Sequence, residues 1–367
     1  MDGIDCMEKT IYLHIGGRKT GTTAIQLFLS SNRAQLKKKG YLYPGYPRHA
    51  HHEITKELLY HPLPEIRESR VLNKYREEIR RSPCNNVILS AEGLEGLFQK
   101  VSLLEEFLLQ DSAVRIIFYV RRQDERIESN YNQMVKGAMI RTHETFSQYY
   151  GSGNLPLLDY YNVLLPWRDA FGKENILVRC YEKEQIPNGI IRDFLTTVGL
   201  ELDKSFIIPQ TWANPSLNWD LIEIIRLCNI QFKDDISFHR YLLNSLKNVK
   251  LNEGLKKQYL LSPHQRRDLI EKYAESNEKV AREYLGRKDG GLFYAPLPES
   301  DEPWGPYEGL TIKKCIPVFT QMLHNLDLQF ELNNRTIFEK VLIRSKFWDT
   351  ALGNIIKQSF TGSIKKR

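Results

Sequence analysis

The sequence has no apolar run long enough to cross a membrane and no recognisable export signal. A transmembrane helix needs about 20 consecutive, mainly apolar residues, and no stretch of the 367 residues approaches that length. The first nine residues are acidic and polar, whereas a secretory signal begins with basic residues and continues with apolar ones. We therefore expect a cytoplasmic protein.

Cysteine is also scarce. The five cysteines are an odd number, lie far apart and form no Cys-x-x-Cys pair; they are Cys6, Cys84, Cys180, Cys228 and Cys315. A disulfide framework or a structural zinc site needs cysteines that are paired and closely spaced. Neither is expected here.

Positive charge is concentrated at one end of the chain. The net charge of the chain is +7. The segment from Arg335 to Arg367 contains eight Lys or Arg and two acids, so its own net charge is +6. The remainder is nearly neutral, so a nucleic-acid-binding surface is not indicated. Aromatic residues such as Phe338 and Trp348 recur near helical spacing in this basic segment. One interpretation is peripheral contact with the inner face of a membrane; the other is a helix packed on the body with its basic face in water.

The order of apolar segments predicts an α/β fold. Four short runs rich in Val, Ile and Leu show little alternation, as in strands buried on both faces; they are 10–15, 87–90, 114–120 and 176–181. Apolar residues at helical spacing follow them, at 22–38, 94–109, 124–135, 157–171 and 189–198. This alternation predicts a three-layer domain, related to the P-loop folds, with a central parallel sheet.

The second half of the chain is predicted to be mainly helical. Helical patterns occupy 217–228, 237–246 and 262–285. Residues 296–306 hold four prolines and three acids, a composition typical of a linker. We therefore predict a main domain over 9–295, a linker over 296–306 and a basic helical extension over 307–367.

The strongest functional signal is the segment from Tyr12 to Thr23, in which an apolar strand passes through a Gly-rich turn into a helix. Such a turn directs backbone N–H groups and the positive end of the helix at one point, which suits a phosphate. Gly16 and Gly21 have the separation found in a nucleotide-triphosphate loop, but Thr22 occupies its lysine position, and Lys19 lies inside the turn. The loop therefore predicts a phosphate site that is not an ATPase site.

The run from Gly17 to Thr23 resembles the 5′-phosphosulfate-binding loop of sulfotransferases that use 3′-phosphoadenosine 5′-phosphosulfate (PAPS), whose core is Lys-[Ser/Thr]-Gly-Thr-Thr. In that family the lysine contacts the 5′-phosphate and the bridging oxygen. The resemblance implies that Lys19 assists departure of the bisphosphate. It also implies a set of cofactor-binding residues: Gly17, Arg18, Lys19, Thr20, Gly21, Thr22 and Thr23. The alternative is an ordinary tight turn.

A second motif follows the third predicted strand. Arg121 ends that strand, and Ser129 lies eight residues later in the next predicted helix, which resembles the family's 3′-phosphate site. A guanidinium and a hydroxyl both suit a phosphate dianion. The alternative is a solvent-exposed helix whose charges pair with each other; these are Arg122, Asp124, Glu125 and Arg126.

A weaker resemblance continues over 167–200 and is closest to bacterial carbohydrate-type members of the superfamily. Tyr181 lies where many members place an aromatic ring near the adenine, although a half-buried tyrosine at a strand end is an equally good interpretation. The resemblance covers about 10–295. It implies that PAPS is the donor and that the acceptor is a hydroxyl of a carbohydrate, such as a surface, capsular or lipid-linked glycan.

Sulfuryl transfer of this kind needs a cation for the leaving phosphate and a base for the acceptor proton, but no metal. Glu92 is the first candidate for the base, because it follows the second predicted strand and ligands bind beyond the carboxyl ends of strands. Capping of the following helix is the alternative for Glu92. The rival base is His52 or its neighbour His51, in a loop that also holds His49 and Glu53 without a reliable metal-ligand spacing.

Two further functions remain open from the sequence. One is a kinase-like P-loop phosphotransferase, which would bind magnesium-ATP in preference to PAPS. The other is a non-catalytic module that binds a nucleotide or a glycan without turnover.

Overall fold

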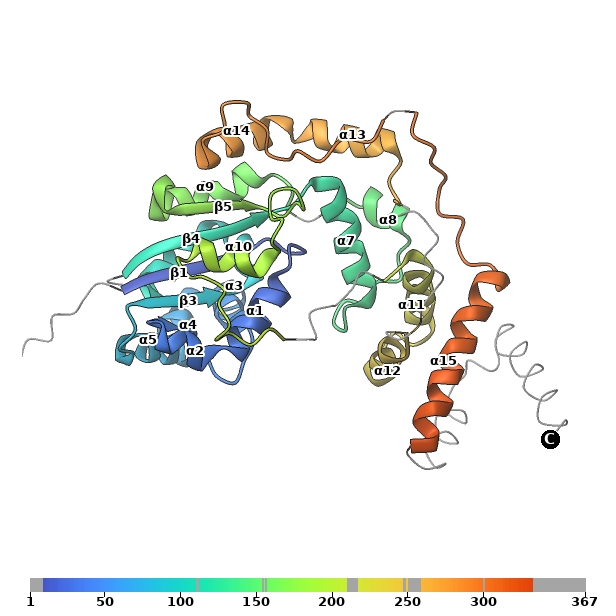
Figure 1. The fold of residues 1–367 in the computed structure, drawn as a ribbon, viewed down its shortest axis with the longest axis horizontal. Helices are drawn as coiled ribbons and strands as arrows, with labels where there is room; N and C mark the ends of the chain where they lie inside the picture. The colour runs from blue at the N-terminus through green and yellow to red at the C-terminus, as the bar shows by residue number, and fades with distance from the viewer. Residues whose placement is uncertain are drawn as a thin grey trace, which may run out of the picture.

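The computed structural model describes residues 9–109, 112–153, 155, 157–209, 217–246, 249, 259–299 and 301–332 (Figure 1). The basic segment 335–367, with its predicted membrane contact, lies outside the described residues.

The centre of the fold is a five-stranded parallel sheet. Its strands are β1 (Lys9–Gly16), β2 (Tyr41–Leu42), β3 (Asn86–Ser90), β4 (Ser112–Val120) and β5 (Ile176–Cys180), in the order β2-β3-β1-β4-β5. Leu13 of β1 is level with Leu89 of β3 and with Ile116 of β4. All three side chains are fully buried, which explains the continuous apolar runs. The predicted parallel α/β sheet is confirmed, and the ends of β1, β3, β4 and β5 meet at one edge.

Helices cover both faces of the sheet. One face is covered by α1 (Thr22–Ser31), α2 (Arg33–Lys38) and α10 (Ile190–Thr197). The other is covered by α3 (His52–Tyr60), α4 (Leu63–Arg67), α5 (Arg70–Arg81), α6 (Val101–Leu108), α9 (Tyr160–Phe171) and α14 (Ala274–Leu285). Neighbouring residues of β4 pack into the two opposite cores. Phe118 packs on the side of α9 and α14, and Tyr119 packs on the side of α1 and α10. The result is the three-layer arrangement expected from the sequence.

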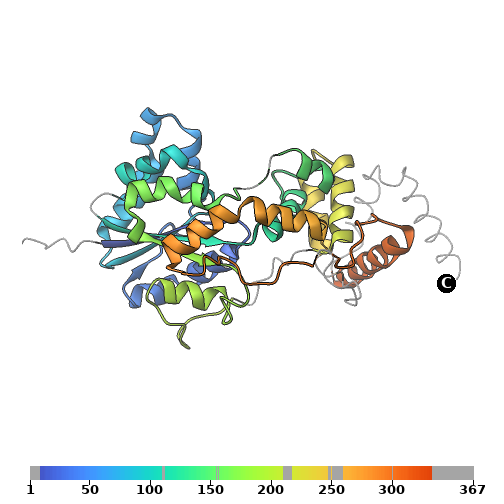
Figure 2. The ribbon, with the colours of Figure 1, turned by 90° about the horizontal axis from the view of Figure 1, so that it is seen from above.

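A helical lobe stands beside the sheet and has a core of its own. It consists of α7 (Gln123–Lys136), α8 (Phe146–Gly151), α11 (Trp219–Gln231), α12 (Ile236–Leu246), α13 (Pro263–Lys272) and α15 (Ile312–Leu332). Ile127 and Tyr131 of α7 pack there against Ile225 of α11 and Leu242 of α12. Helix α7 begins just after β4, so it connects the edge of the sheet to this lobe (Figures 1 and 2).

Three predicted helices differ from those observed. The helix predicted over 22–38 is divided at Asn32, whose side chain donates to Phe28 O and to Ile207 O and accepts from Ile207 N–H; such side-chain bonds compete with the helix. The helix predicted over 94–109 is preceded by the 3₁₀ helices η1 (Glu92–Gly96) and η2 (Phe98–Lys100). The one over 262–285 is divided at Tyr273. A third 3₁₀ helix, η3 (Lys173–Asn175), precedes β5.

The predicted linker is attached to the helical lobe. Among the described residues of 286–311 there is no helix or strand. The indole N–H of Trp304 donates to Tyr259 O at 2.9 Å, and the Tyr307 hydroxyl donates to Asp220 Oδ1 at 2.8 Å. The domain boundaries predicted at 295 and 306 remain predictions.

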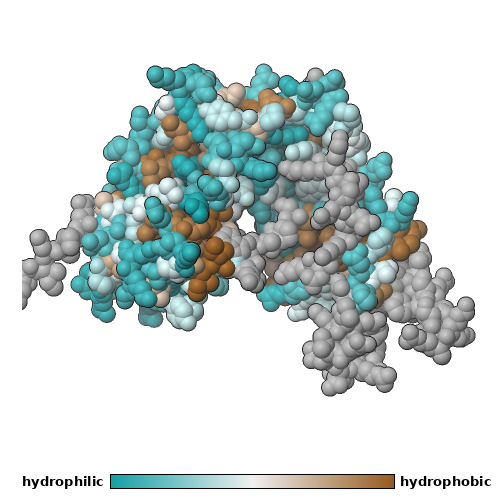
Figure 3. Space-filling model, viewed as in Figure 1, coloured by the Kyte–Doolittle hydropathy of each residue, from teal (hydrophilic) through white to brown (hydrophobic). Residues whose placement is uncertain are grey.

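Hydrophilic side chains cover most of the face seen in Figure 3, and hydrophobic ones gather there in smaller patches. Within the described ranges, no helix combines the length and the apolar character needed to pass through a bilayer.

Candidate functional site

The loop between β1 and α1 is held against the end of β4. The Gly17 N–H donates to Tyr119 O at 2.9 Å, and the Thr20 hydroxyl donates to Gly17 O at 2.5 Å. A Cβ at Gly17 would lie 2.8 Å from Tyr119 O, closer than any side chain tolerates. Glycine is therefore required at this position because backbone packs on backbone. Thr20 is fully buried and closes the loop.

Lys19 has an unusual backbone conformation. Its φ is +68°, in the left-handed region that costs a residue with a Cβ about 1–2 kcal/mol. Two contacts hold it there: Arg121 NH1 donates to Lys19 O at 3.1 Å, and Lys19 Nζ donates to Gln133 Oε1 at 3.3 Å. Burial lowers the pKa of the Lys19 ammonium; the nearby charge of Glu92 acts in the opposite direction and that of Arg121 in the same direction.

Arg121 joins the two predicted motifs. It follows β4 directly, and the Tyr160 hydroxyl donates to its carbonyl. Besides the bond to Lys19 O, its guanidinium forms an ion pair with Glu125 at 3.1 Å. The guanidinium carbon lies 5.6 Å from the ring centre of Tyr181, and the Tyr181 N–H donates to Val120 O at 2.7 Å. Three segments far apart in the sequence, the loop, Arg121 and Tyr181, therefore meet at the edge of the sheet.

The other charges of the second motif are buried in ion pairs. Arg122 pairs with Asp124 at 2.9 Å, and Asp124 pairs also with Arg266 of α13 at 2.8 Å. Arg126 is fully buried and pairs with Glu95 of η1 at 2.8 Å. The exposure predicted by the alternative interpretation is therefore wrong for Arg122, Asp124 and Arg126, whereas the predicted pairing holds for Arg122 with Asp124. Their charges are withdrawn from water, which proteins tolerate only when the partners are in place.

A polar stripe on α7 faces the loop. Ser129, Gln133 and Lys136 recur at intervals of four and three residues, so they share one face of the helix. The contact of Gln133 with Lys19 Nζ turns that face toward the loop. Ser129, which is 8% exposed, was predicted to be part of the site. Gln133 and Lys136 were not, because their helical spacing from Ser129 becomes informative only once the orientation of α7 is known.

Glu92 lies beside the loop. As the first residue of η1 it follows β3 closely, and it accepts a hydrogen bond from the Thr22 hydroxyl at 2.6 Å. Thr22 is 3% exposed, so its hydroxyl serves this contact with Glu92. Thr23 and Arg18 are exposed, and Arg18 Nε lies 3.6 Å from Glu95. The structure thus brings the predicted base and Lys19 into one electrostatic environment.

His51 joins the end of β3 to the segment that precedes α3 through both ring nitrogens. Nδ1 accepts from Ser90 N–H at 2.8 Å, so Nε2 carries the hydrogen and donates to Pro44 O at 3.0 Å. Burial lowers the pKa of His51 to about 4, which keeps the ring neutral. His52 is exposed at the start of α3. Of the two histidines proposed as bases, only His52 is placed with its ring in solvent. In the described part of the chain, no three His, Cys, Asp or Glu side chains gather as metal ligands do.

A cavity of about 520 Å³ opens beside Tyr181. Residues that line it include Arg122, Glu125, Tyr181, Ile190, Phe293 and Ala295. Tyr181 and Ile190 are also the side chains nearest to Gly21 of the loop, at 3.2 and 3.3 Å from where a Cβ would stand. The cavity therefore adjoins the phosphate loop, and its size is that of a small-ligand site.

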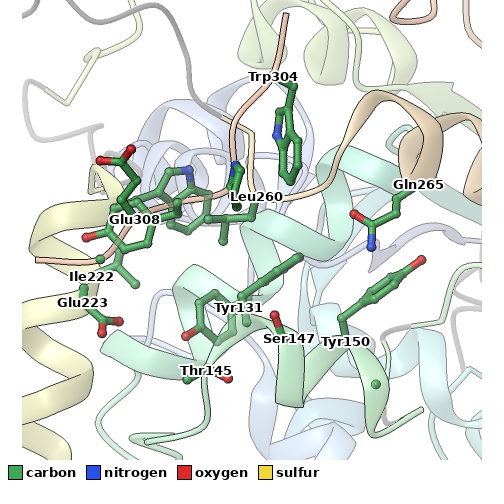
Figure 4. A pocket seen from close by; sticks show the side chains of 16 residues that line it. Tyr131, Thr145, Ser147, Tyr150, Ile222, Glu223, Leu260, Gln265, Trp304 and Glu308 are labelled. Carbon is green, nitrogen blue, oxygen red and sulfur yellow. The ribbon is translucent and has the colours of Figure 1, made fainter. Parts of the chain in front are cut away.

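A second cavity, of about 590 Å³, lies in the helical lobe (Figure 4). Six aromatic side chains line it: Tyr131, Phe146, Tyr150, Trp219, Trp304 and Tyr307. In the close-up, Trp304 lies above, and Tyr131, Ser147 and Tyr150 lie below. None of its described lining residues is Lys or Arg, and the carboxylate of Glu223 is paired with Arg226 at 2.6 Å. The cavity thus offers aromatic faces, hydroxyl groups and the carboxylate of Glu308.

No family model matches the sequence. The chain is 31% identical over 204 residues to an uncharacterised protein of Archaeoglobus fulgidus, and the match covers 55% of each chain. This chain therefore spans about half the length of that relative.

Three solved structures share a partial likeness with this chain. A sulfotransferase from Alicyclobacillus acidocaldarius has a TM-score of 0.36 at 15% identity, and the match covers 62% of this chain and 98% of that one. The sulfotransferase domain of the Synechococcus PCC 7002 olefin synthase has a TM-score of 0.34 at 14% identity, covering 74% and 98%. A mouse sulfotransferase complexed with PAP has a TM-score of 0.31 at 13% identity, covering 77% and 87%.

Proposed function

We propose that this chain transfers a sulfuryl group from PAPS to a hydroxyl of a carbohydrate. The observation that carries the proposal is the bond from the Arg121 guanidinium to the carbonyl of Lys19, beside the ring of Tyr181. It joins, in one place, the three segments that resemble the 5′-phosphosulfate, 3′-phosphate and adenine sites of PAPS-dependent sulfotransferases. An ordinary tight turn does not account for this convergence.

The residues present fit the nucleotide. The helix α1 begins at the loop, so its N-terminal N–H groups and the Lys19 ammonium are available to the 5′-phosphate. Arg121 and Ser129 are suited to the 3′-phosphate, and the cavity beside Tyr181 is large enough for a purine. When bound, PAPS supplies an activated sulfuryl group on a phosphate leaving group.

The chain's own residues then have separate tasks. Lys19 places a positive charge where negative charge develops on the leaving phosphate. Its low-dielectric surroundings strengthen that interaction. Glu92 accepts the proton of the acceptor hydroxyl as the new bond forms, with the Thr22 hydroxyl holding the carboxylate in place. His52 remains the alternative base.

The aromatic cavity of the helical lobe favours a carbohydrate acceptor. Ring faces pack against the apolar faces of sugar rings, while hydroxyl and amide groups at the rim meet sugar hydroxyls. Tyr131, which lines this cavity, points about 200° around α7 from Ser129 and Gln133. The cavity and the loop therefore lie on opposite sides of one helix. An acceptor several sugar units long, such as a capsular or lipid-linked glycan, suits this arrangement better than a monosaccharide does.

Replacing Trp304 with alanine is expected to raise the KM for a neutral hexasaccharide acceptor about tenfold, because an aromatic contact of this kind contributes about 0.5–1.5 kcal/mol beyond its buried area. The affinity for 3′-phosphoadenosine 5′-phosphate (PAP), measured by calorimetry, should not change. Tyr60→Ala, which removes an exposed ring on α3, is the matched control. Equal KM values for Trp304→Ala and the control would show that the cavity does not bind the acceptor.

Calorimetric titration with PAP, beside magnesium-ATP, tests the donor directly. We expect PAP to bind in the micromolar range and Arg121→Ala to weaken it by about 10–100-fold, the worth of a charge-assisted hydrogen bond. Arg80→Ala, which removes an exposed arginine of α5, should leave the affinity unchanged. Preference for magnesium-ATP would favour the kinase-like alternative. Tight PAP binding without turnover of PAPS would favour the non-catalytic module.

A further inference from the structure

The 3₁₀ helix η1 carries two carboxylates on one face. Glu92 and Glu95 are three residues apart, and side chains at that spacing eclipse each other in a 3₁₀ helix. Glu92, the proposed base, accepts a hydrogen bond from the Thr22 hydroxyl at 2.6 Å. Glu95 Oε2 lies 3.3 Å from the point where a Cβ on Gly17 would stand. Both carboxylates therefore face the phosphate loop, one at Thr22 and the other at Gly17.

Glu95 is held by a buried ion pair with α7. Arg126 NH2 donates to Glu95 Oε2 at 2.8 Å, and both side chains are withdrawn from solvent. Arg18 of the loop lies farther away, with its Nε 3.6 Å from Glu95 Oε1, and more than half of its side chain is exposed. Glu95 therefore ties η1 to α7 through Arg126 and, more loosely, to the loop through Arg18.

The Arg126 guanidinium has Glu95 as its charged partner. Among the residues that the structure describes, neither Nε nor NH1 of Arg126 has a hydrogen-bond partner. NH1 lies 3.1 Å from the Cβ position of Gly17. The guanidinium carbon lies 5.4 Å from the ring centre of Tyr160, whose hydroxyl donates to Arg121 O. Removing one partner of a buried ion pair is strongly destabilising, so each of these two side chains fixes the other.

Close packing holds η1 on its other sides. A Cβ on Gly16 would lie 3.1 Å from Glu92 O, so the backbone of η1 lies directly on the end of β1. Leu94 is 1% exposed and belongs to the apolar core. These contacts place the backbone of η1 and do not involve its carboxylates. The carboxylate face is positioned by polar contacts, the shortest of which come from Thr22 and Arg126.

We propose that Glu95 and Arg126 are positioning residues for the base, and that their ion pair orients η1 so that Glu92 reaches the acceptor hydroxyl. This rests on the proposed function. Glu92 is the carboxylate left for proton transfer, because Glu95 is already paired and buried. Arg126 also neutralises Glu95 beside a loop proposed to bind an anion. A displacement of about 1 Å at a reacting group can cost about 100-fold in rate, so the pair should matter to turnover without touching the substrate.

The test replaces both partners with apolar side chains of similar length, in the double variant Glu95→Met/Arg126→Met. Such a replacement of a buried ion pair is often neutral for stability. Transfer from PAPS to a neutral hexasaccharide should fall about tenfold or more, because Glu92 loses its orientation. Transfer from p-nitrophenyl sulfate to PAP releases p-nitrophenolate and needs no base, so its rate should stay within about twofold. PAP affinity, measured by calorimetry, should also be retained.

A comparison in the Glu92→Gln background separates positioning from general damage. If the pair acts through Glu92, replacing it there should cause no further loss of transfer to the hexasaccharide. Arg179→Met is the matched control, because it breaks an ion pair with the buried Asp193 of α10, outside η1. It should lower the melting temperature without changing the ratio of the two transfer rates. Equal losses in both reactions, or a further loss in Glu92→Gln, would overturn the proposal.

The single variant Glu95→Gln covers the case in which the double variant does not fold. It keeps the size of the side chain and an oxygen for Arg126 NH2, so we expect the same selective loss at a lower level, about threefold or more. A readout without turnover is the carbon-13 signal of the Glu92 carboxylate in the free protein, assigned by its absence from Glu92→Gln. This signal should shift in the Glu95 variants and not in Arg179→Met; an unchanged signal would contradict a positioning role.

The outcomes distinguish the two levels of inference. If the wild type binds no PAP and transfers no sulfuryl group in either reaction, the proposed function itself fails. If the wild type is active and the Glu95 variants behave as Arg179→Met does, only the positioning role of Glu95 and Arg126 fails.

Discussion

Replacing Lys19 with methionine is expected to lower the rate of sulfuryl transfer by about 10²- to 10³-fold, the usual effect of removing one group that stabilises developing charge. Methionine keeps the length and the apolar stem of the side chain but carries no ammonium. The bond from Arg121 reaches the backbone carbonyl of Lys19, so the loop retains this contact. Lysine and methionine both carry a Cβ, so the backbone strain at φ +68° is the same in the wild type and the variant. The loss would therefore report the missing charge.

The measurement is transfer of radiolabelled sulfur from PAPS to a set of neutral hexasaccharides, with PAP affinity determined in parallel. Lys38→Met removes an exposed lysine of α2 on the same side of the sheet and should behave as the wild type. Near-normal turnover in Lys19→Met, with PAP still bound, would show that the leaving phosphate does not depend on this lysine. Loss of PAP binding together with turnover would place Lys19 in binding as well as in catalysis.

The sheet was predictable because burial on both faces leaves a simple trace in the sequence. The four long strands are continuous apolar runs, and all of them were identified. β2 was missed because two residues, Tyr41 and Leu42, are too short to form such a run. The helices of 52–81 were missed for another reason. In α5, Leu72, Tyr75 and Ile79 are the buried residues and recur at helical spacing, but charged residues between them hide the pattern.

Within the site, the sequence revealed the residues whose position follows from the strand that precedes them in the chain. Lys19 and Arg121 each stand at the end of an apolar strand, so their position at the edge of the sheet follows from topology. Gln133 and Lys136 depend on which face of α7 turns toward the loop. That orientation is set by packing of Ile127 and Tyr131 in the helical lobe, which a motif cannot reveal. The Thr22 hydroxyl meets Glu92, which lies far away in the sequence, so only the tertiary fold reveals that contact, whereas the Thr20 hydroxyl closes the loop locally on Gly17 O.

Replacing Glu92 with glutamine should lower the transfer rate by about 10²- to 10⁴-fold, the range for removal of a general base. The glutamine oxygen still accepts the hydrogen bond from the Thr22 hydroxyl, so the contact that fixes this residue to α1 survives. The proton acceptor is lost, and with it the negative charge that raises the pKa of Lys19. PAP affinity should stay within about twofold, because Glu92 is not assigned a contact with the nucleotide phosphates.

The comparison that assigns the base uses His52→Asn and a reaction that needs no base. Transfer of a sulfuryl group from p-nitrophenyl sulfate to the 5′-phosphate of PAP releases p-nitrophenolate, an anion that needs no proton to leave. Glu92→Gln should spare this reaction and impair transfer to the glycan, whereas Lys19→Met should impair both. If His52→Asn shows the selective loss and Glu92→Gln does not, the base is the exposed histidine at the start of α3. The part of Glu92 would then be to hold Thr22 and to keep Lys19 charged, since its carboxylate is the group that raises the pKa of that lysine.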